Sequence, residues 1–185
     1  MISSNLPRFA GMNGNLLVII DPQLDFIGEG GFYGKRHEGM TQIRDACANI
    51  QALLSRSLDL DVVLVYSDYK PGQFGEQVSM CIPGTDGHKI GLQLTDRITL
   101  IPKTEHSCFS SASFKRYLED RRVERLIICG FLAEYCVRQT VLDGLAGGYK
   151  MAVLTPCVGT GDDVQGAREE TFKFLEERGV ELRLE

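Results

Sequence analysis

Residues 126–140 read LIICGFLAEYCVRQT, and this stretch decides the fold of the chain. It begins with an apolar run typical of a buried strand, continues through a glycine turn and ends as the first turn of a helix. In α/β sheets, ligands bind at turns of this kind. Cys136 lies where turn becomes helix, and unpaired backbone N–H groups and the helix dipole favour a thiolate there. The stretch therefore predicts a nucleophilic cysteine at the edge of a sheet.

Short apolar strands alternate with amphipathic helices on both sides of this stretch. We expect strands at residues 16–20, 62–66, 98–101, 123–129, 150–154 and 180–184. We expect helices around Met40, Ile43, Cys47, Ile50 and Leu54, around Phe114, Tyr117 and Leu118, and over 136–148 and 164–178. The alternation is typical of a three-layer α/β/α, Rossmann-like domain with a six-stranded, mostly parallel sheet. We expect a single domain over residues 16–185, preceded by an N-terminal extension of residues 1–15.

Composition and charge exclude several classes of partner. The chain has 185 residues and a net charge of −5 without a basic run, so no nucleic acid partner is expected. No apolar stretch is long enough to span a bilayer, so no membrane partner is expected. The start of the chain lacks the apolar core of a signal peptide, which favours a cytoplasmic location. The six cysteines are scattered and are interpreted as free thiols, and the absence of CxxC and HExxH motifs predicts no metal or other cofactor.

Three ionisable residues lie at the carboxyl ends of predicted strands: Asp21 after the first, Lys103 after the third and Cys136 after the fourth. The carboxyl ends of parallel strands meet at one edge of a sheet, so we expect these side chains to lie close together. Asp21 would take the thiol proton, and Lys103 would balance the charge of both anions. Such a set suits hydrolysis of an amide or ureide, with the N–H groups near Leu132 and Cys136 receiving the oxyanion. Each residue also has a structural interpretation, as a turn-forming aspartate, a solvated lysine or a buried thiol.

Three segments, LLVIIDPQLDF, IPKTEHSCFSSASF and ICGFLAEYCVRQTVLDGLAGGY, resemble the three motifs of the isochorismatase-like cysteine hydrolases, in the order of that family. The family includes nicotinamidases, N-carbamoylsarcosine amidases, and ureido-amide and biuret hydrolases. The resemblance implies Asp21, Lys103 and Cys136 as a catalytic triad, and a sheet order of 3-2-1-4-5-6. It also implies a cis peptide at Phe131–Leu132 that turns the amides of Leu132 and Cys136 into an oxyanion hole. The expected partners are a small-molecule substrate and further copies of the chain, as a homo-oligomeric dimer or tetramer.

The chain departs from the nicotinamidase pattern after the second strand. Nicotinamidases carry a metal site there, made of an Asp and histidines. Asp68 matches the Asp, but Lys70 and Met80 stand where two of the histidines belong. A lysine and a thioether are not ligands of a hard metal, so the sequence favours a metal-independent enzyme. Asp68 is then a loop residue or a polar pocket group. His88 in PGTDGHKI is interpreted as a solvated loop histidine rather than a contact with the substrate or with a neighbouring subunit.

The substrate is expected to depend on the long irregular stretch over residues 69–95, because loops of this length are usually functional. The alternative is that a neighbouring subunit closes the pocket. His106 and Ser107 follow Lys103 closely enough to reach the site without replacing a member of the triad. The side chains expected to line the pocket are Phe26, Asp68, Tyr69, Phe109 and Tyr135.

We therefore expect a metal-independent cysteine hydrolase that cleaves the C–N bond of a small amide, carbamoyl or ureido compound through a thioester intermediate. One alternative is an isochorismatase-type hydrolase of a vinyl ether, a reaction that does not need the cysteine. A second is a catalytically silent binding or scaffold protein on the same fold. A third is a thiol redox sensor that uses Cys136, which requires a resolving cysteine nearby.

Overall fold

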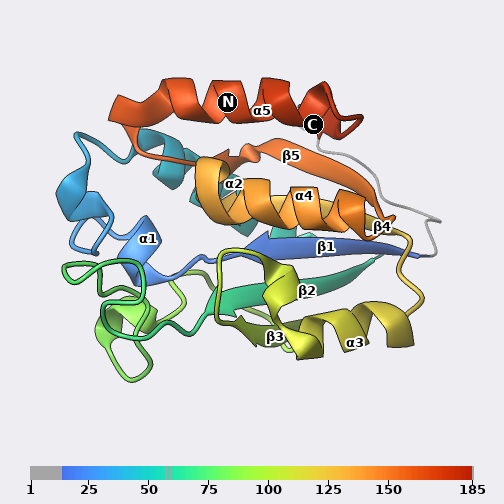
Figure 1. Ribbon diagram of the computed structural model, residues 1–185, viewed down its shortest axis with the longest axis horizontal. Helices are drawn as coiled ribbons and strands as arrows, with labels where there is room; N and C mark the ends of the chain where they lie inside the picture. Colours follow the sequence, from blue (N-terminus) through green and yellow to red (C-terminus); the bar gives the residue numbers. More distant parts are fainter. Residues whose placement is uncertain (1–13, 57, 59, 185) are drawn as a thin grey trace.

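One six-stranded sheet forms the middle layer of the molecule (Figure 1). The computed structural model describes residues 14–56, 58 and 60–184. The strand order is β3-β2-β1-β4-β5-β6, and every neighbouring pair is parallel. The strands are β1 (Asn15–Ile20), β2 (Asp61–Ser67), β3 (Ile98–Lys103), β4 (Arg125–Phe131), β5 (Lys150–Gly159) and β6 (Glu181–Arg183). The predicted fold class and strand order are confirmed. Of the expected N-terminal extension, residues 1–13 lie outside the described residues, and Asn15 already belongs to β1.

Helices cover both faces of the sheet. They are α1 (Leu24–Ile27), α2 (Thr41–Leu54), α3 (Ala112–Asp120), α4 (Arg138–Ala146) and α5 (Gln165–Glu176). Short 3₁₀ turns are η1 (Gly34–Arg36), η2 (Asp86–His88), η3 (Cys108–Ser110) and η5 (Asp162–Val164). Helix α2 lies behind the sheet in Figure 1, whereas α3 and α4 lie in front of it and α5 runs along the top of the view. The apolar residues of α3, α4 and α5 share one core cluster, and those of α2 belong to the other.

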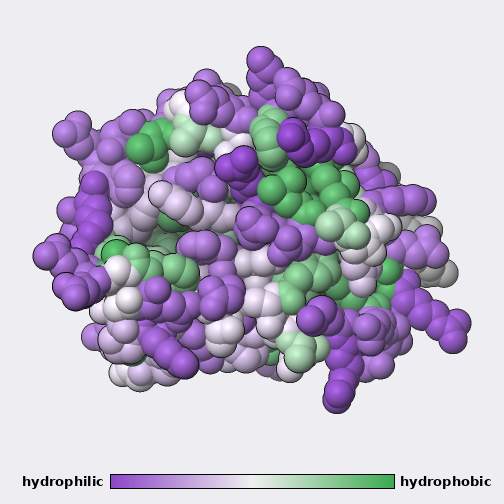
Figure 2. Space-filling view, in the orientation of Figure 1, coloured by the Kyte–Doolittle hydropathy of each residue, from purple (hydrophilic) through white to green (hydrophobic). Residues whose placement is uncertain are grey.

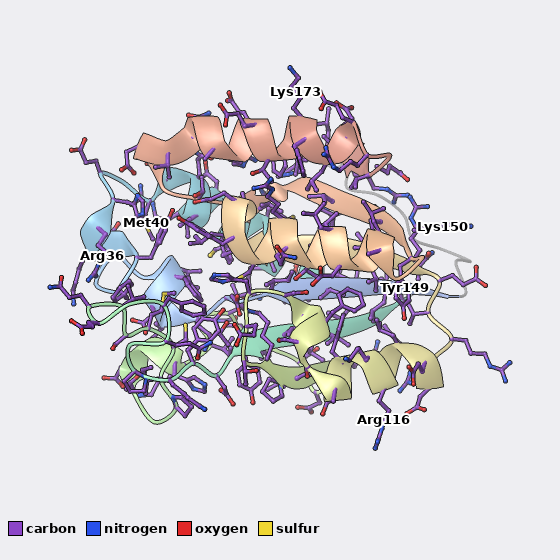
Figure 3. The ribbon with its side chains drawn as sticks, viewed as in Figure 1. Arg36, Met40, Arg116, Tyr149, Lys150 and Lys173 are labelled. Carbon is purple, nitrogen blue, oxygen red and sulfur yellow. The ribbon has the colours of Figure 1, made fainter. Side chains whose placement is uncertain are left out.

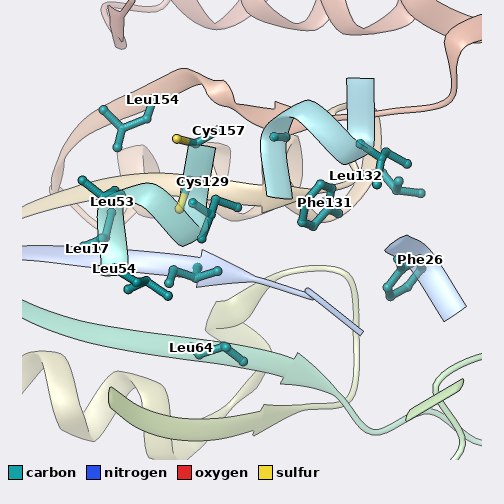
Figure 4. Close-up of a cluster of buried hydrophobic side chains, with 14 of the residues drawn as sticks. Leu17, Phe26, Leu53, Leu54, Leu64, Cys129, Phe131, Leu132, Leu154 and Cys157 are labelled. Atoms are coloured by element: carbon teal, nitrogen blue, oxygen red, sulfur yellow. The ribbon is translucent and has the colours of Figure 1, made fainter. Parts of the chain in front are cut away.

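The sheet separates two apolar clusters, because successive side chains of a strand point to opposite faces. In β1, Leu17 and Ile19 contact the α2 side (Figure 4), whereas Leu16, Val18 and Ile20 contact the opposite side. All five side chains have no exposed surface. Strands buried on both faces read as continuous apolar runs, which is why β1 is recognisable in the sequence.

Gly130 brings the ends of β1 and β4 close together. It pairs in register with Ile20 and has a φ of 116°, a left-handed conformation that favours glycine. A Cβ atom at this position would lie 2.1 Å from the carbonyl oxygen of Ile20, so no larger residue fits. The close approach places Asp21, the residue after β1, beside the chain that leaves β4.

The chain after β4 differs from the prediction. A π turn, η4 (Ala133–Val137), precedes α4, so the helix does not begin at Cys136. The amide of Val137 donates to the carbonyl of Leu132, five residues back, at 3.2 Å. Cys136 therefore lies inside a widened turn, a feature common at functional sites. Strand β5 also extends past the predicted residue 154, because a register shift between Ile128 and Gly130 lets β4 continue pairing with it.

The face of the molecule in Figure 2 is largely hydrophilic, with apolar side chains in small, separate patches. This matches the two buried clusters, which hold most of the large apolar side chains. Within the described part of the chain, no helix is both long and apolar enough to cross a membrane.

Candidate active site

The structure brings together Asp21, which follows β1, Lys103, which is the last residue of β3, and Cys136, which lies in the turn after β4. Lys103 Nζ lies 2.9 Å from Asp21 Oδ2 and 3.5 Å from Cys136 Sγ. The exposed fractions of Asp21, Lys103 and Cys136 are 0%, 1% and 3%. A carboxylate, an ammonium and a thiol are thus in mutual reach in a space almost closed to bulk water.

Ser67, the last residue of β2, links the aspartate to the lysine. Its hydroxyl donates to Asp21 Oδ1 at 2.8 Å and accepts from Lys103 Nζ at 2.8 Å. The Gln23 side chain holds the backbone of Ser67 in place, accepting from its N–H at 2.7 Å and donating to its carbonyl at 2.9 Å. Sequence reasoning missed Ser67 and Gln23. The only sequence signal for Ser67 was its position at the end of a predicted strand. In the structure Ser67 pairs in register with Lys103 on the neighbouring strand.

The phenol of Tyr69 lies behind the triad. Its oxygen accepts from Lys103 Nζ at 3.0 Å and lies 3.7 Å from Cys136 Sγ. Burial raises the pKa of Tyr69 far above its usual range, so the phenol stays protonated. The carbonyl of Glu105 accepts a further hydrogen bond from Lys103 Nζ, at 3.0 Å. The ammonium is therefore fixed from several sides.

Electrostatics keep Lys103 charged and Cys136 neutral in the resting enzyme. Burial alone would lower the pKa of Lys103, but the charge of Asp21 raises it well above the ordinary value. Burial raises the pKa of the Cys136 thiol, the charge of Lys103 opposes this, and the charge of Asp21 adds to it. The expectation of a resting thiolate at a helix start was therefore wrong, because complete burial beside a carboxylate outweighs the dipole of one turn.

A buried thiol needs a base at hand, and Asp21 has the required acceptor. Its Oδ2 atom forms the ion pair with Lys103 but receives no directed hydrogen bond from any residue that the structure describes. The backbone of Asp21 is left-handed, with φ 52°, a conformation that aspartate tolerates better than most residues. Its amide donates to the carbonyl of Val65 at 2.9 Å, which fixes this turn against β2.

Cys136 lies in the wall of a cavity of about 460 Å³. The residues that line the cavity are mainly aromatic or aliphatic: Phe26, Phe32, Tyr33, His37, Phe74, Val78, Met80, His106, Leu132, Tyr135 and Cys136. Lysine, arginine, aspartate and glutamate are absent from this lining. The peptide bond between Phe131 and Leu132, at the base of the π turn, is cis.

The model of the isochorismatase domain matches residues 15–183. The chain belongs to the isochorismatase family. It is 28% identical over 152 residues to a probable inactive nicotinamidase of Arabidopsis thaliana, a match that covers 72% of this chain and 74% of that protein. The fold resembles that of the pyrazinamidase of Pyrococcus horikoshii in complex with zinc, with a TM-score of 0.79 at 20% identity over 92% of this chain and 98% of that one. It also resembles an isochorismatase-like hydrolase from Alkaliphilus metalliredigens, with a TM-score of 0.77 at 20% identity over 93% and 94% of the two chains.

The residues of this isochorismatase-like hydrolase do not fit a metal site beside the triad. The carboxylate of Asp68 is engaged by His88, whose Nε2 lies 2.5 Å from Oδ1. Met80 contributes to the apolar cavity wall, and Lys70 is exposed. In the described ranges, no three His, Cys, Asp or Glu side chains gather in a way that suits a metal ion.

Two of the five expected pocket residues line the cavity, and three do not: Asp68, Tyr69 and Phe109. Phe26 and Tyr135 lie in its wall. Asp68 is instead tied to His88, so the expectation that His88 is a solvated loop histidine was also wrong. The ring of His88 is half-buried and packs edge-on against Tyr66. The pair forms because the stretch after Thr85 folds back over the end of β2, a contact that local sequence does not specify.

Phe109 was wrongly expected in the pocket. Its ring contacts Phe114 and Tyr149, with centroids 5.4 and 5.7 Å away. Figure 3 shows Tyr149 at the opposite end of the molecule from Arg36 and Met40, which lie on the side of α1. Phe109 follows the triad lysine closely in sequence, but the 3₁₀ turn η3 directs its ring under α3 and α4.

Proposed function

We propose that this hydrolase cleaves the C–N bond of a small, uncharged amide, carbamoyl or ureido compound through a thioester on Cys136, without a metal ion. One observation carries the proposal: Cys136 Sγ lies in the wall of the cavity, and Lys103 Nζ lies 3.5 Å from it while holding Asp21. A nucleophile, a base and a compensating cation thus lie together at the surface that a substrate would touch.

The first half of the reaction forms the thioester. Asp21 accepts the thiol proton while Sγ attacks the carbonyl carbon, and Lys103 stabilises the sulfur as it becomes negative. The N–H groups of Leu132 and Cys136 receive the oxyanion of the tetrahedral intermediate. Asp21 then gives its proton to the leaving nitrogen, the C–N bond breaks, and ammonia or an amine departs.

The second half regenerates the enzyme. Water attacks the thioester carbon and loses a proton to Asp21, which has become a carboxylate again. The C–S bond breaks, the acid departs, and Asp21 returns its proton to Cys136. One water is consumed for each C–N bond that is broken.

The cavity narrows the class of substrate. Its lining offers mainly apolar contacts and no lysine, arginine, aspartate or glutamate, and transfer of an unpaired charge from water into such a space is costly. An uncharged substrate is therefore favoured, with its reactive carbonyl against Cys136. Vinyl ether hydrolysis does not need a sulfur nucleophile, so the position of Cys136 disfavours this alternative. A redox sensor is disfavoured because Cys136 alone among the six cysteines lines the cavity.

The test is a panel of neutral and charged amides, carbamoyl compounds and ureides assayed for release of ammonia or amine. Cys136→Ala should lower turnover of any active compound by several powers of ten, to about the level left when a catalytic nucleophile is removed from other hydrolases. Its melting temperature and circular dichroism should stay close to those of the wild type. Cys47→Ala, which removes a partly buried thiol of α2, is the matched control and should keep its activity. Near-normal turnover by Cys136→Ala would refute the mechanism.

A further inference from the structure

A fourth polar side chain reaches the nucleophile. His106 lies on the loop between Lys103 and η3, and its Nδ1 atom is 3.8 Å from Cys136 Sγ. It also lines the cavity, from which Asp21 and Lys103 are absent. The mechanism above gives His106 no role, although it is the polar side chain placed both at the sulfur and in the cavity wall.

Aromatic rings hold His106 in this position. Its ring is stacked on that of Phe74, with centroids 4.6 Å apart and planes 14° from parallel. Tyr135 lies 5.9 Å away on the helix side, and Tyr69 meets the ring edge-on at 6.5 Å. The stacking therefore fixes the plane of the imidazole ring, and with it the directions in which the ring nitrogens point.

The surroundings keep this imidazole neutral. Burial lowers the pKa of His106, the charge of Lys103 lowers it further, and the charges of Asp21 and Glu105 oppose the shift without reversing it. A neutral imidazole has one nitrogen with a lone pair, which accepts a hydrogen bond.

We propose that His106 binds the leaving nitrogen of the scissile bond, accepting a hydrogen bond from it as Asp21 protonates it. The inference rests on the function proposed above. The leaving nitrogen is bonded to the carbon that Sγ attacks, so it lies within reach of a ring nitrogen 3.8 Å from Sγ. Because this nitrogen becomes positive as it departs, a neutral acceptor stabilises the transition state more than the bound substrate.

The other cavity histidine supplies a matched control. His37 is stacked on Tyr33 with centroids 3.9 Å apart, and its Nδ1 lies 3.0 Å from Asp163 Oδ1. Its contacts with Tyr33 and Asp163 give it no role at the leaving nitrogen. His37→Phe should therefore change kcat/KM by the same factor for an amide and for the ester of the same shape.

The experiment compares an active amide with the ester of the same acyl group, whose leaving oxygen has no N–H. His106→Phe keeps an aromatic ring against Phe74 and removes the acceptor. It should lower kcat/KM for the amide by about 10- to 100-fold, the effect of a hydrogen bond to a charged group, and change that for the ester less than about threefold. His106→Asn, which restores an acceptor, should recover part of the amide activity.

If the wild type does not hydrolyse the ester, a second measurement, inhibition by an aldehyde, takes its place. An aldehyde with the same acyl group adds reversibly to Cys136 and has no leaving group, so its inhibition constant should be the same for His106→Phe and the wild type. An equal loss for amide and ester, weaker aldehyde inhibition by His106→Phe, or undiminished amide turnover would overturn the role of His106. Amide turnover by Cys136→Ala would instead overturn the proposed function.

Discussion

Lys103 Nζ lies 2.9 Å from Asp21 Oδ2, and both side chains are completely buried. Burying an ion pair costs desolvation free energy, and apolar side chains of similar size often stabilise a fold as well or better. Stability therefore does not explain why this pair lies behind the cavity. The proposed mechanism does explain it, because in that mechanism both charges serve to move a proton from sulfur to nitrogen.

Removing one partner of this pair should destabilise the protein. Lys103→Met should lower the free energy of unfolding by about 3–5 kcal/mol, since Asp21 becomes an uncompensated buried charge. Urea denaturation at neutral pH measures the change. The double variant Asp21→Asn, Lys103→Met removes both charges and should regain part of the loss. Lys89→Met, which removes the surface partner of Asp86, is the control and should unfold like the wild type. Equal losses in the single and double variants would contradict this account.

Ser67→Ala should reduce the rate more than substrate binding. The hydroxyl bonds both Asp21 and Lys103 at 2.8 Å but does not line the cavity. We expect kcat to fall by about tenfold or more with KM nearly constant, and unfolding free energy to fall by about 1–3 kcal/mol because a buried carboxylate oxygen loses its donor. Ser55→Ala, at an exposed hydroxyl after α2, is the matched control. A change confined to KM would argue against this role.

The positions of the strands were predictable from local apolar patterns. The proximity of Asp21, Lys103 and Cys136 was predictable from the rule that the carboxyl ends of parallel strands share one edge of the sheet. Buried parallel strands read as apolar runs, and their carboxyl ends share an edge, so Asp21, Lys103 and Cys136 were placed from sequence order alone. The roles of Ser67 and His106 depend on the direction of side chains, which those patterns do not contain. Ser67 precedes Asp68, an expected pocket residue, and His106 was itself expected to reach the site, although without a role.

The pocket was less predictable because it is built from several loops. Phe32 and Phe74 face the same cavity, although 42 positions separate them in the sequence. Phe109 shows the opposite error: an aromatic residue close to Lys103 in sequence turned out to pack beneath α3 and α4. The π turn around Cys136 was missed because apolar periodicity predicts only regular helices.

We predict that the protein needs no transition metal for activity. Asp68 is paired with His88, and neither Lys70 nor Met80 is a suitable ligand for zinc or iron. Elemental analysis of protein purified without a metal-affinity tag should find far less than one equivalent of metal per chain. Turnover should survive dialysis against a strong chelator. One equivalent of zinc or iron, lost together with activity on chelation and regained on addition, would sink this prediction.

The rate at which Cys136 is alkylated should depend on pH and on the charges of Lys103 and Asp21. Its pKa is raised by burial, so the thiolate fraction is small at neutral pH and grows as pH rises. The rate of labelling by iodoacetamide should therefore climb by about tenfold per pH unit between pH 6 and 8, without the plateau that a thiolate of low pKa would give. Peptide mapping in a Cys47→Ala background, which removes the most accessible other thiol, identifies the site.

Lys103→Met should slow this labelling at every pH, because the thiolate loses the positive charge 3.5 Å away while Asp21 still repels it. Lys70→Met, at an exposed lysine of the loop after β2, should leave the rate unchanged. A pH-independent rate, or equal rates for the Lys103→Met and Lys70→Met variants, would mean that Asp21, Lys103 and Cys136 do not act as one electrostatic unit. A slower rate in Lys103→Met alone would tie the reactivity of the sulfur to the buried ion pair.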